Sequence, residues 1–447
     1  MTSEKILAIR VNEPELQFCY GVHKNPRKIV SFKPFSYKNL LNEEVNIKLL
    51  TDTETRSLGA KLINHIIKGY SILNEGIPSF YDVFGTKLIF HENQDIIGTS
   101  PKNIMVDLEE AFDTLKSNAT RGIVVITLDD IPSNVYIGVK KKTLLSKSNI
   151  RVQLIRKRTI ESHMNSGGYV YLLMNIATAM YAKIGGIPWK LSRSILSTEG
   201  LILGISFSRK RVKTSQSEEI YYGAIQLFDK YGEHLYTEVK IFTASPEELK
   251  SKGLFVPYEK LRSILEKAIK EHKVPQIIIH KSAPIVDEEI EAVREIIEKY
   301  SNDEFPMLYI FTHVKSGTIY RAYDPSTSDY SIQRGLMLLR QGRSSKWIQY
   351  IIFTTGRLYR KARERNKLGT PKPLELAIDT NISDTTRLPS YIGEQILALT
   401  KLDWNTLEPE IREPITIKYS RKAAQLAPEI LTPQLPDFVI ADIRDLM

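Results

Sequence analysis

Four polar residues between positions 136 and 183 have side chains suited to holding a phosphate and a base. Tyr136 and Lys140 are four residues apart, so on a helix they share one face. Tyrosine offers a ring for stacking, and lysine donates charge-assisted hydrogen bonds to phosphate. Gln153 can add an amide N–H from a later segment, and Lys183 comes just before a Gly-Gly pair. Together these residues predict an anion site with an aromatic platform.

Each of these residues alone also has a simpler interpretation. The run Lys140–Lys142 is typical of a solvated basic face. Lys183, near the end of a predicted helix, can complement the helix dipole, and Tyr136 can be a half-buried packing residue. The predicted site therefore depends on folding to bring the ordered set together.

The segments around these residues alternate between strand and helix. Residues 122–128 form a continuous apolar, β-branched run, which is typical of a buried parallel strand. A helix is predicted over 134–146, a strand over 152–155 and a helix over 169–184. This order predicts an α/β, Rossmann-like domain. No G-x-G-x-x-G follows a strand, which disfavours ordinary dinucleotide binding.

The pattern changes after about residue 190. Three successive strands are predicted, and alternating helices and strands follow them. The strands are 201–208, 221–228 and 235–242, and the later elements are 258–272 (helix), 274–280 (strand), 287–300 (helix), 307–314 (strand) and 318–323 (strand). Three antiparallel strands followed by this alternation are the layout of the RNase H-like fold.

Composition limits the class of protein. The chain has 447 residues, 42% hydrophobic and 26% charged, which is ordinary for a globular protein of two or three domains. Its formal net charge of +10 mildly favours polyanionic partners. Cys19 is the only cysteine, so an intrachain disulfide and a cysteine-based zinc site are excluded. The start of the chain lacks the apolar core of a signal peptide, and the apolar run 169–180 is too short to span a bilayer. We therefore expect a cytoplasmic protein, which would reach a membrane only through a partner.

The order Tyr136-x-x-x-Lys140, then Gln153, then Lys183 before Ile-Gly-Gly-Ile-Pro-Trp resembles the MID domain of Argonaute proteins, which is joined to a PIWI domain. Further similar stretches at 368–373, 399–404 and 414–422 extend the resemblance over about residues 120 to 430. The resemblance implies that Tyr136, Lys140, Gln153 and Lys183 hold the 5′ phosphate of a guide strand, and that the tyrosine stacks on its first base.

The resemblance also implies a domain organisation. We expect an N-terminal segment at 1–110 that packs on MID and PIWI, a MID domain at 111–190 and a PIWI domain at 191–447. The region before residue 122 is too short for both an N and a PAZ domain, so the resemblance is to a short prokaryotic, archaeal-type Argonaute without PAZ.

The resemblance leaves open a divalent cation in the guide pocket. In the family this cation is held partly by the C-terminal carboxylate, which Met447 would supply. Ala179 stands where a metal-contacting side chain is expected. A magnesium ion at the guide's 5′ phosphate is therefore an open possibility, and we expect no catalytic cofactor.

Three positions of the PIWI resemblance carry residues unsuited to cutting nucleic acid. The family's catalytic aspartates and its last aspartate or histidine correspond here to Ser206, Ser282 and Arg421. Two-metal catalysis places cations about 4 Å apart and requires several carboxylates. We therefore expect no enzymatic activity from this site. One alternative is an active RNase H-like, guide-dependent endonuclease with relocated carboxylates such as Asp287–Glu289, although an acidic cluster at a helix N-terminus is the simpler interpretation.

The resemblance to short, inactive Argonautes implies a function. The protein would hold a short 5′-phosphorylated guide and recognise a complementary target without cleaving it, with RNA favoured as the guide and DNA as the target. It would trigger a separately encoded effector protein in prokaryotic antiviral or anti-plasmid defence, of the abortive-infection kind. A second alternative is a protein-interaction scaffold with incidental nucleic-acid binding. Basic residues at 209–213 and 340–365 are candidates for the nucleic-acid groove.

Overall fold

The computed structural model describes most of the chain in two compact units. The described residues are 7–72, 75–118, 121–146, 148–164, 166–209, 218–327, 330–339, 347–358, 371–383, 386–432 and 434–447. The small-sheet unit consists of residues 16–190, 403–409 and 444–447. The large-sheet unit consists of residues 1–15, 191–402 and 410–443.

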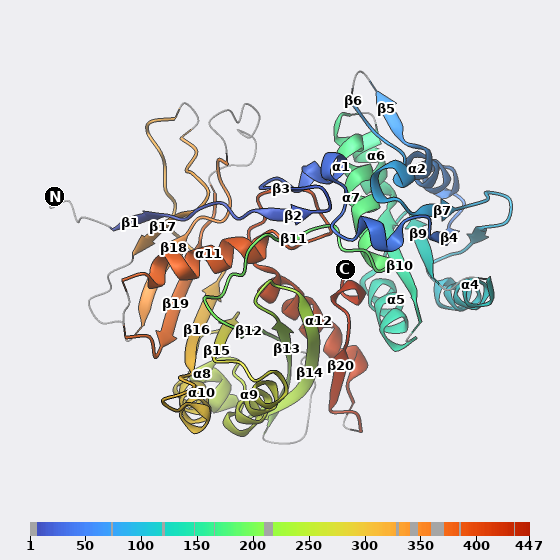
Figure 1. Ribbon diagram of the computed structural model, residues 1–447. Helices are drawn as coiled ribbons and strands as arrows, with labels where there is room; N and C mark the ends of the chain where they lie inside the picture. Colours follow the sequence, from blue (N-terminus) through green and yellow to red (C-terminus); the bar gives the residue numbers. More distant parts are fainter. Residues whose placement is uncertain are drawn as a thin grey trace. The chain divides into compact units, whose positions relative to one another are not determined.

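A parallel sheet forms the centre of the small-sheet unit (Figure 1). Its strands are β4 (Glu44–Thr51), β7 (Lys87–Ile89), β8 (Ile96–Gly98), β9 (Gly122–Leu128) and β10 (Ile150–Arg156). The order is β10-β9-β4-β7, with β8 also paired to β4, and every pair is parallel. All seven residues of β9 are buried, as its apolar sequence predicts.

Helices cover both faces of this sheet. On one face, α4 (Ile104–Asn118) and α5 (Ser133–Leu145) pack on Ile126 and its neighbours in one apolar core. On the other face lies α2 (Arg56–Lys68), whose Gly59 approaches the side chains of Leu49 and Thr127. Side chains alternate between the faces of a strand, so neighbouring residues such as Ile126 and Thr127 serve opposite layers. The remaining elements are β2 (Leu16–Phe18), β3 (Gly21–His23), α1 (Ile29–Phe32), β5 (Tyr70–Ile72), β6 (Glu75–Ile77), α3 (Phe80–Phe84), α6 (Lys157–Met164) and α7 (Gly168–Lys183).

The large-sheet unit is built on a ten-stranded mixed sheet of order β1-β17-β18-β19-β16-β15-β12-β13-β14-β20. Strands β12, β13 and β14 are antiparallel neighbours, and β15 and β16 continue parallel to β12. The strands are β1 (Ala8–Arg10), β12 (Gly200–Ser208), β13 (Glu219–Phe228), β14 (His234–Ala244), β15 (Gln276–Lys281), β16 (Leu308–Lys315), β17 (Leu336–Leu339), β18 (Ile348–Ile352), β19 (Leu374–Thr380) and β20 (Asp437–Ile440), and β11 (Lys190–Leu191) lies at the boundary of the units. This central arrangement is consistent with the predicted RNase H-like layout.

The helices of this unit separate into two layers. Helices α9 (Tyr258–His272) and α10 (Asp287–Tyr300) pack on an apolar core formed with β12, β13 and β15. Helix α12 (Ile415–Ile430) packs on β12, where an added Cβ at Gly204 would lie 2.2 Å from the Thr416 oxygen. Only glycine permits this close approach of helix to strand. The other helices are α8 (Pro246–Lys252) and α11 (Leu388–Thr400).

The N-terminal residues divide differently from the predicted segment 1–110. Strand β1 pairs with β17, and Glu13 forms ion pairs with Arg334 and Lys401, so residues 7–15 belong to the large-sheet unit. Residues 16–110 belong to the small-sheet unit because β4 is inserted between β9 and β7. Strand partners far apart in sequence decide this division, and local patterns do not show them.

One predicted strand does not form. Residues 318–323 have no strand, and Ile319 in this segment is 89% exposed. Its alternating sequence therefore lacks the neighbouring strand that would complete a ladder. None of the helices that the structure describes has both the length and the apolar character needed to cross a bilayer.

Candidate functional site

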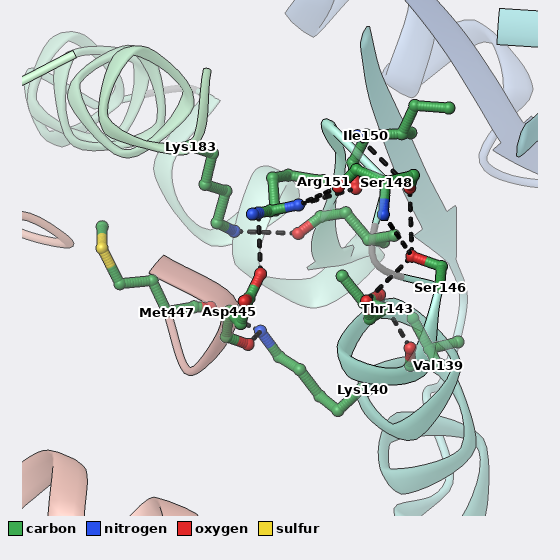
Figure 2. Close-up of polar contacts among 11 residues, drawn as sticks. Val139, Lys140, Thr143, Ser146, Ser148, Ile150, Arg151, Lys183, Asp445 and Met447 are labelled. Atoms are coloured by element: carbon green, nitrogen blue, oxygen red, sulfur yellow. Dashed lines mark hydrogen bonds and ion pairs between the residues drawn. The ribbon is translucent and has the colours of Figure 1, made fainter. Parts of the chain in front are cut away.

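Lys140 is a buried cation whose charged end faces the last residues of the chain. It lies on α5 and is 3% exposed. Its Nζ donates to the main-chain oxygen of Met447 at 2.7 Å and to that of Asp445 at 3.3 Å (Figure 2). Oxygen acceptors offset the cost of removing an ammonium from water. The helix thus holds a positive charge at a fixed point beside the chain end.

Lys183 is a second buried cation and it contacts a predicted partner. It is the last residue of α7, is 5% exposed, and donates from Nζ to the Gln153 side-chain oxygen at 2.6 Å and to the Val152 carbonyl at 2.9 Å. The helix stops there because Gly185 adopts a φ of +102°, which glycine tolerates. The structure therefore brings Lys183 and Gln153 together from α7 and β10.

Arg151 is a member of this site that the sequence interpretation missed. Its Nε lies 2.7 Å from the Asp445 carboxylate, and the two side chains are 15% and 14% exposed. Arg151 and Gln153 are two residues apart on β10, so they point to the same side of the strand. The Arg-x-Gln spacing in the sequence indicates that the two side chains share one side of the strand. Only the position of Asp445 shows that Arg151 belongs to the site.

These contacts define a cation cluster, Lys140, Arg151 and Lys183, drawn from α5, β10 and α7. Figure 2 shows Lys140 and Arg151 extending toward Asp445 and Met447. Lys183 contacts the Gln153 side chain. Of the contacts described above, two are to carboxylates, those of Asp445 and of the terminal residue Met447, and the others are to carbonyl or amide oxygens. An excess of fixed positive charge is suited to an anion with several oxygens.

Tyr136 lies one turn before Lys140 on α5. Its ring is half-buried and packs on the core that includes Val135 and Val139, and burial raises the pKa of its hydroxyl. The residue therefore combines a packing role with a partly accessible ring. The helix places it on the same face as Lys140, as predicted.

The two carboxylates beside the cation cluster, of Asp445 and of the terminal residue Met447, are both paired with cations. Magnesium requires near-octahedral oxygen ligands, usually including carboxylates. The Asp445 carboxylate is paired with Arg151, and the Met447 main-chain oxygen accepts from Lys140. Within the described ranges no group of three or more His, Cys, Asp or Glu is arranged to hold a metal, and Ala179 on α7 is buried.

In the large-sheet unit, Ser206 is fully buried in the middle of β12. Its hydroxyl oxygen lies 2.7 Å from that of Ser420 on α12. Ser282 follows β15, and its N–H donates to the carbonyl of Ile205, the residue before Ser206, at 2.9 Å. Arg421 instead forms an ion pair with Glu413 at 2.7 Å. Ser206 and Ser420 therefore form a buried pair of hydroxyl groups that joins β12 to α12.

A buried ion pair lies next to the β12 segment that contains Ser206. The Nζ of Lys281 lies 2.6 Å from Glu289, and both side chains are fully buried. Glu289 also accepts backbone N–H groups from Val256 and Val286, and Glu288 pairs with Lys252. Two of the three acids considered as relocated ligands are thus engaged in ion pairs at the start of α10.

His280 is buried next to α12. Its Nδ1 lies 3.0 Å from the Thr416 hydroxyl, and burial lowers the pKa of His280 to about 3. The imidazole is therefore neutral at pH 7. This agrees with a packing role at the end of β15.

Few of the candidate groove residues lie in the described part of the chain. Arg209 pairs with Glu219, and Arg357 lies 3.5 Å from Asp324. The others, Lys210, Arg211, Lys213, Arg340, Arg343, Arg360, Arg363 and Arg365, fall outside the described residues, as do residues 368–370 of the family-like stretch 368–373.

Comparison with known proteins identifies the family. A family model described as "Piwi domain" matches residues 123–431. A curated relative, "Protein argonaute" from Cereibacter sphaeroides, is 22% identical over 427 residues, which cover 90% of this chain and 52% of the relative. The chain therefore spans about half the length of the curated relative it matches.

Solved structures show the same fold. Clostridium butyricum Argonaute, bound to a guide DNA and a 19-mer target DNA, superposes with a TM-score of 0.69 at 21% identity, covering 98% of this chain and 54% of that one. Drosophila Piwi gives 0.60 at 11% identity, covering 94% and 54%. Aquifex aeolicus Argonaute gives 0.59 at 18% identity, covering 98% and 55%. Because the Piwi model matches more than half of the chain, this protein belongs to the family of proteins with a Piwi domain.

Proposed function

We propose that this protein, a short prokaryotic Argonaute of archaeal type, holds the 5′-phosphorylated end of a short guide strand and uses that guide to recognise a complementary nucleic acid. The observation that carries the proposal is the cation cluster. Two lysines only 3% and 5% exposed and one arginine come from three separate elements of one unit. The bound guide and target DNA of the Clostridium butyricum protein support a guide and a target as partners.

A terminal phosphate suits this cluster better than an internal one. A phosphate monoester carries about −1.5 to −2 charges at pH 7, whereas each phosphodiester carries one. Lys183 donates to the neutral oxygens of Gln153 and Val152, and an incoming dianion would offer it stronger, charge-assisted bonds. Tyr136, one turn from Lys140, offers its partly accessible ring to the first base.

The direct test compares the same guide with and without its 5′ phosphate. We expect the 5′-phosphorylated strand to bind at least about tenfold more tightly than the 5′-hydroxyl strand, because one charge-assisted contact contributes about 1.5–3 kcal/mol. Competition binding with labelled 18-mers measures the ratio. Equal affinities would contradict the proposal.

The same proposal includes recognition without cleavage. Ser206, Ser282 and Arg421 support it, because hydroxyls bind divalent metals poorly and an arginine repels them. Guide-loaded protein should therefore leave a matched, end-labelled target intact in magnesium or manganese. A discrete cut opposite the guide would instead support the alternative of an active nuclease.

The partners and the biological role extend this proposal. We propose an RNA guide, a DNA target and a separately encoded effector that acts in antiviral or anti-plasmid defence. Sequencing of strands recovered with the protein from its native host would identify guide and target by their ends. Guide-independent capture of a protein partner, with no short strands recovered, would favour the scaffold alternative.

Magnesium at the phosphate has its own test. The pairing of Asp445 with Arg151 and of Met447 with Lys140 supports a phosphate held by cationic side chains alone. Removal of divalent ions with EDTA should then change the affinity for a 5′-phosphorylated strand by less than about twofold. A tenfold loss restored by magnesium would show that a metal takes part.

A further inference from the structure

One stretch of the small-sheet unit is positively charged and contains no acid. Residues 16–42 include five lysines and arginines and neither aspartate nor glutamate. The five are Lys24, Arg27, Lys28, Lys33 and Lys38. Lys28 and Lys38 are exposed, and the stretch includes strands β2 and β3 and helix α1. None of these residues belongs to the cation cluster described above.

Exposed aromatic rings accompany this charge. Tyr20 is 57% exposed, Phe35 is 37% exposed and Tyr171 on α7 is 44% exposed. Each ring has a cation over it. The pairs are Lys38 over Tyr20 at 5.9 Å, Lys190 over Phe35 at 4.7 Å and Arg27 over Tyr171 at 4.5 Å, measured to the ring centroid.

Main-chain hydrogen bonds hold the backbone at two of these aromatic residues. Tyr20 donates its N–H to the Phe32 carbonyl at 2.9 Å, and Phe35 donates to the Pro188 carbonyl at 2.9 Å. The Tyr20 ring also lies 6.2 Å from that of Tyr37. A backbone held in this way loses little conformational freedom when a ligand stacks on the side chains.

We propose that the aromatic–lysine surface, formed by Tyr20, Phe35, Tyr37, Lys38 and Lys190, is a contact site for single-stranded nucleic acid. Bases stack on aromatic side chains without regard to sequence, and neighbouring lysines meet the phosphates between them. Protein interfaces are depleted in lysine, so this composition fits a polyanion better than a second protein.

This site does not depend on the end of the strand. Stacking and contacts to internal phosphates need no 5′ phosphate, whereas the proposed guide pocket does. A strand with a 5′-hydroxyl therefore probes the aromatic–lysine surface separately. The outcome of this experiment is independent of whether the cation cluster holds a guide.

The test removes two rings and measures binding of a labelled 5′-hydroxyl oligothymidine 20-mer. Tyr20→Ala with Phe35→Ala should weaken binding by about tenfold or more, since each stacked base contributes about 1–3 kcal/mol. Tyr20→Phe should retain binding, because the ring remains.

A matched control is present in the large-sheet unit. Tyr231 is 39% exposed and lies under Lys230 at 5.4 Å, but Lys230 pairs with Glu199 and Asp229 is adjacent. Tyr231→Ala should leave binding unchanged. A loss equal to that of the double variant would show a general effect of exposed rings and would overturn the proposal.

A second variant tests the charge independently of the rings. Lys38→Gln should lower the slope of log affinity against log salt by about 0.7, the value for one phosphate contact on a single strand.

Ultraviolet cross-linking of a 5-iodouracil strand should label peptides that contain Tyr20 or Phe35. Unchanged affinity of the double variant, or cross-links confined to other regions, would overturn the proposal. So would a double variant that retains the strand but loses a co-purifying protein, because the surface would then be a protein interface.

Discussion

The two units differ in how charged side chains are paired at the positions that the resemblance to Argonaute points out. In the small-sheet unit, three cations, Lys140, Arg151 and Lys183, are brought together from α5, β10 and α7 beside the carboxylates of Asp445 and Met447. In the large-sheet unit, Ser206 and Ser420 share a hydroxyl contact, and the nearby Lys281 is fully neutralised by Glu289. The difference is that three cations gather around two carboxylates in the small-sheet unit, whereas Lys281 and Glu289 form a one-to-one ion pair in the large-sheet unit.

The largest effect should come from removing both lysines of the cation cluster. Lys140→Ala with Lys183→Ala should weaken binding of a 5′-phosphorylated guide by about 3–6 kcal/mol, since each charged contact contributes about 1.5–3 kcal/mol. Equilibrium binding measures the change. Lys141→Ala is the control, because Lys141 is exposed on the same helix and should have no effect. If the double variant still preferred the 5′-phosphorylated strand, the cation cluster would not be the phosphate site, and the contrast between the two units would not hold.

The second largest effect is expected on the stability of the large-sheet unit, from its buried ion pair. Lys281→Met leaves Glu289 buried without its cation and should lower the free energy of unfolding by about 3–5 kcal/mol. Chemical denaturation measures this loss, and guide affinity of the folded protein should not change. Adding Glu289→Met should recover most of the stability, because two apolar side chains then replace the pair. A similar loss in single and double variants would show that packing, and not charge, is responsible.

Acid should destabilise the large-sheet unit. Burial lowers the pKa of His280 to about 3 and that of His313 to about 4, so both are neutral in the folded protein. Below the unfolded value near 6.5 the unfolded chain binds more protons, and stability present above that pH falls as pH decreases toward 4. We expect a loss of about 1–3 kcal/mol between pH 6.5 and 4.5, measured by urea unfolding at each pH. His280→Asn should flatten this dependence. An equally steep profile in that variant would assign the effect to other groups.

The smallest predicted effect concerns the acid opposite Arg151. Asp445→Asn removes the carboxylate that faces the guanidinium at 2.7 Å and should strengthen binding of a 5′-phosphorylated strand a few-fold, about 0.5–1 kcal/mol. The same competition binding detects it, with the 5′-hydroxyl strand as the control. Weaker binding would show that Asp445 positions Arg151 for the phosphate instead of competing with it.

The sequence predicted most elements because local patterns determined them. The apolar run 122–128, the helix around 134–146 and the helix 287–300 are observed as β9, α5 and α10, with ends shifted by one residue or none. These segments have strong periodicity or strong terminal signals. The strand predicted at 318–323 is not observed, because an alternating sequence alone does not supply a neighbouring strand.

What the sequence determined by itself was the identity and order of the polar residues: Tyr136, Lys140, Gln153 and Lys183, and the serines where acids were expected. Only the tertiary structure decided their partners. It placed Met447 against Lys140 and Asp445 against Arg151, contacts that join residues roughly three hundred positions apart. It also paired Ser206 with Ser420 and not with Arg421. The physical reason is that spacing along the chain fixes which residues share a helix face or strand side, whereas contacts between distant segments follow from how the layers bury their apolar faces.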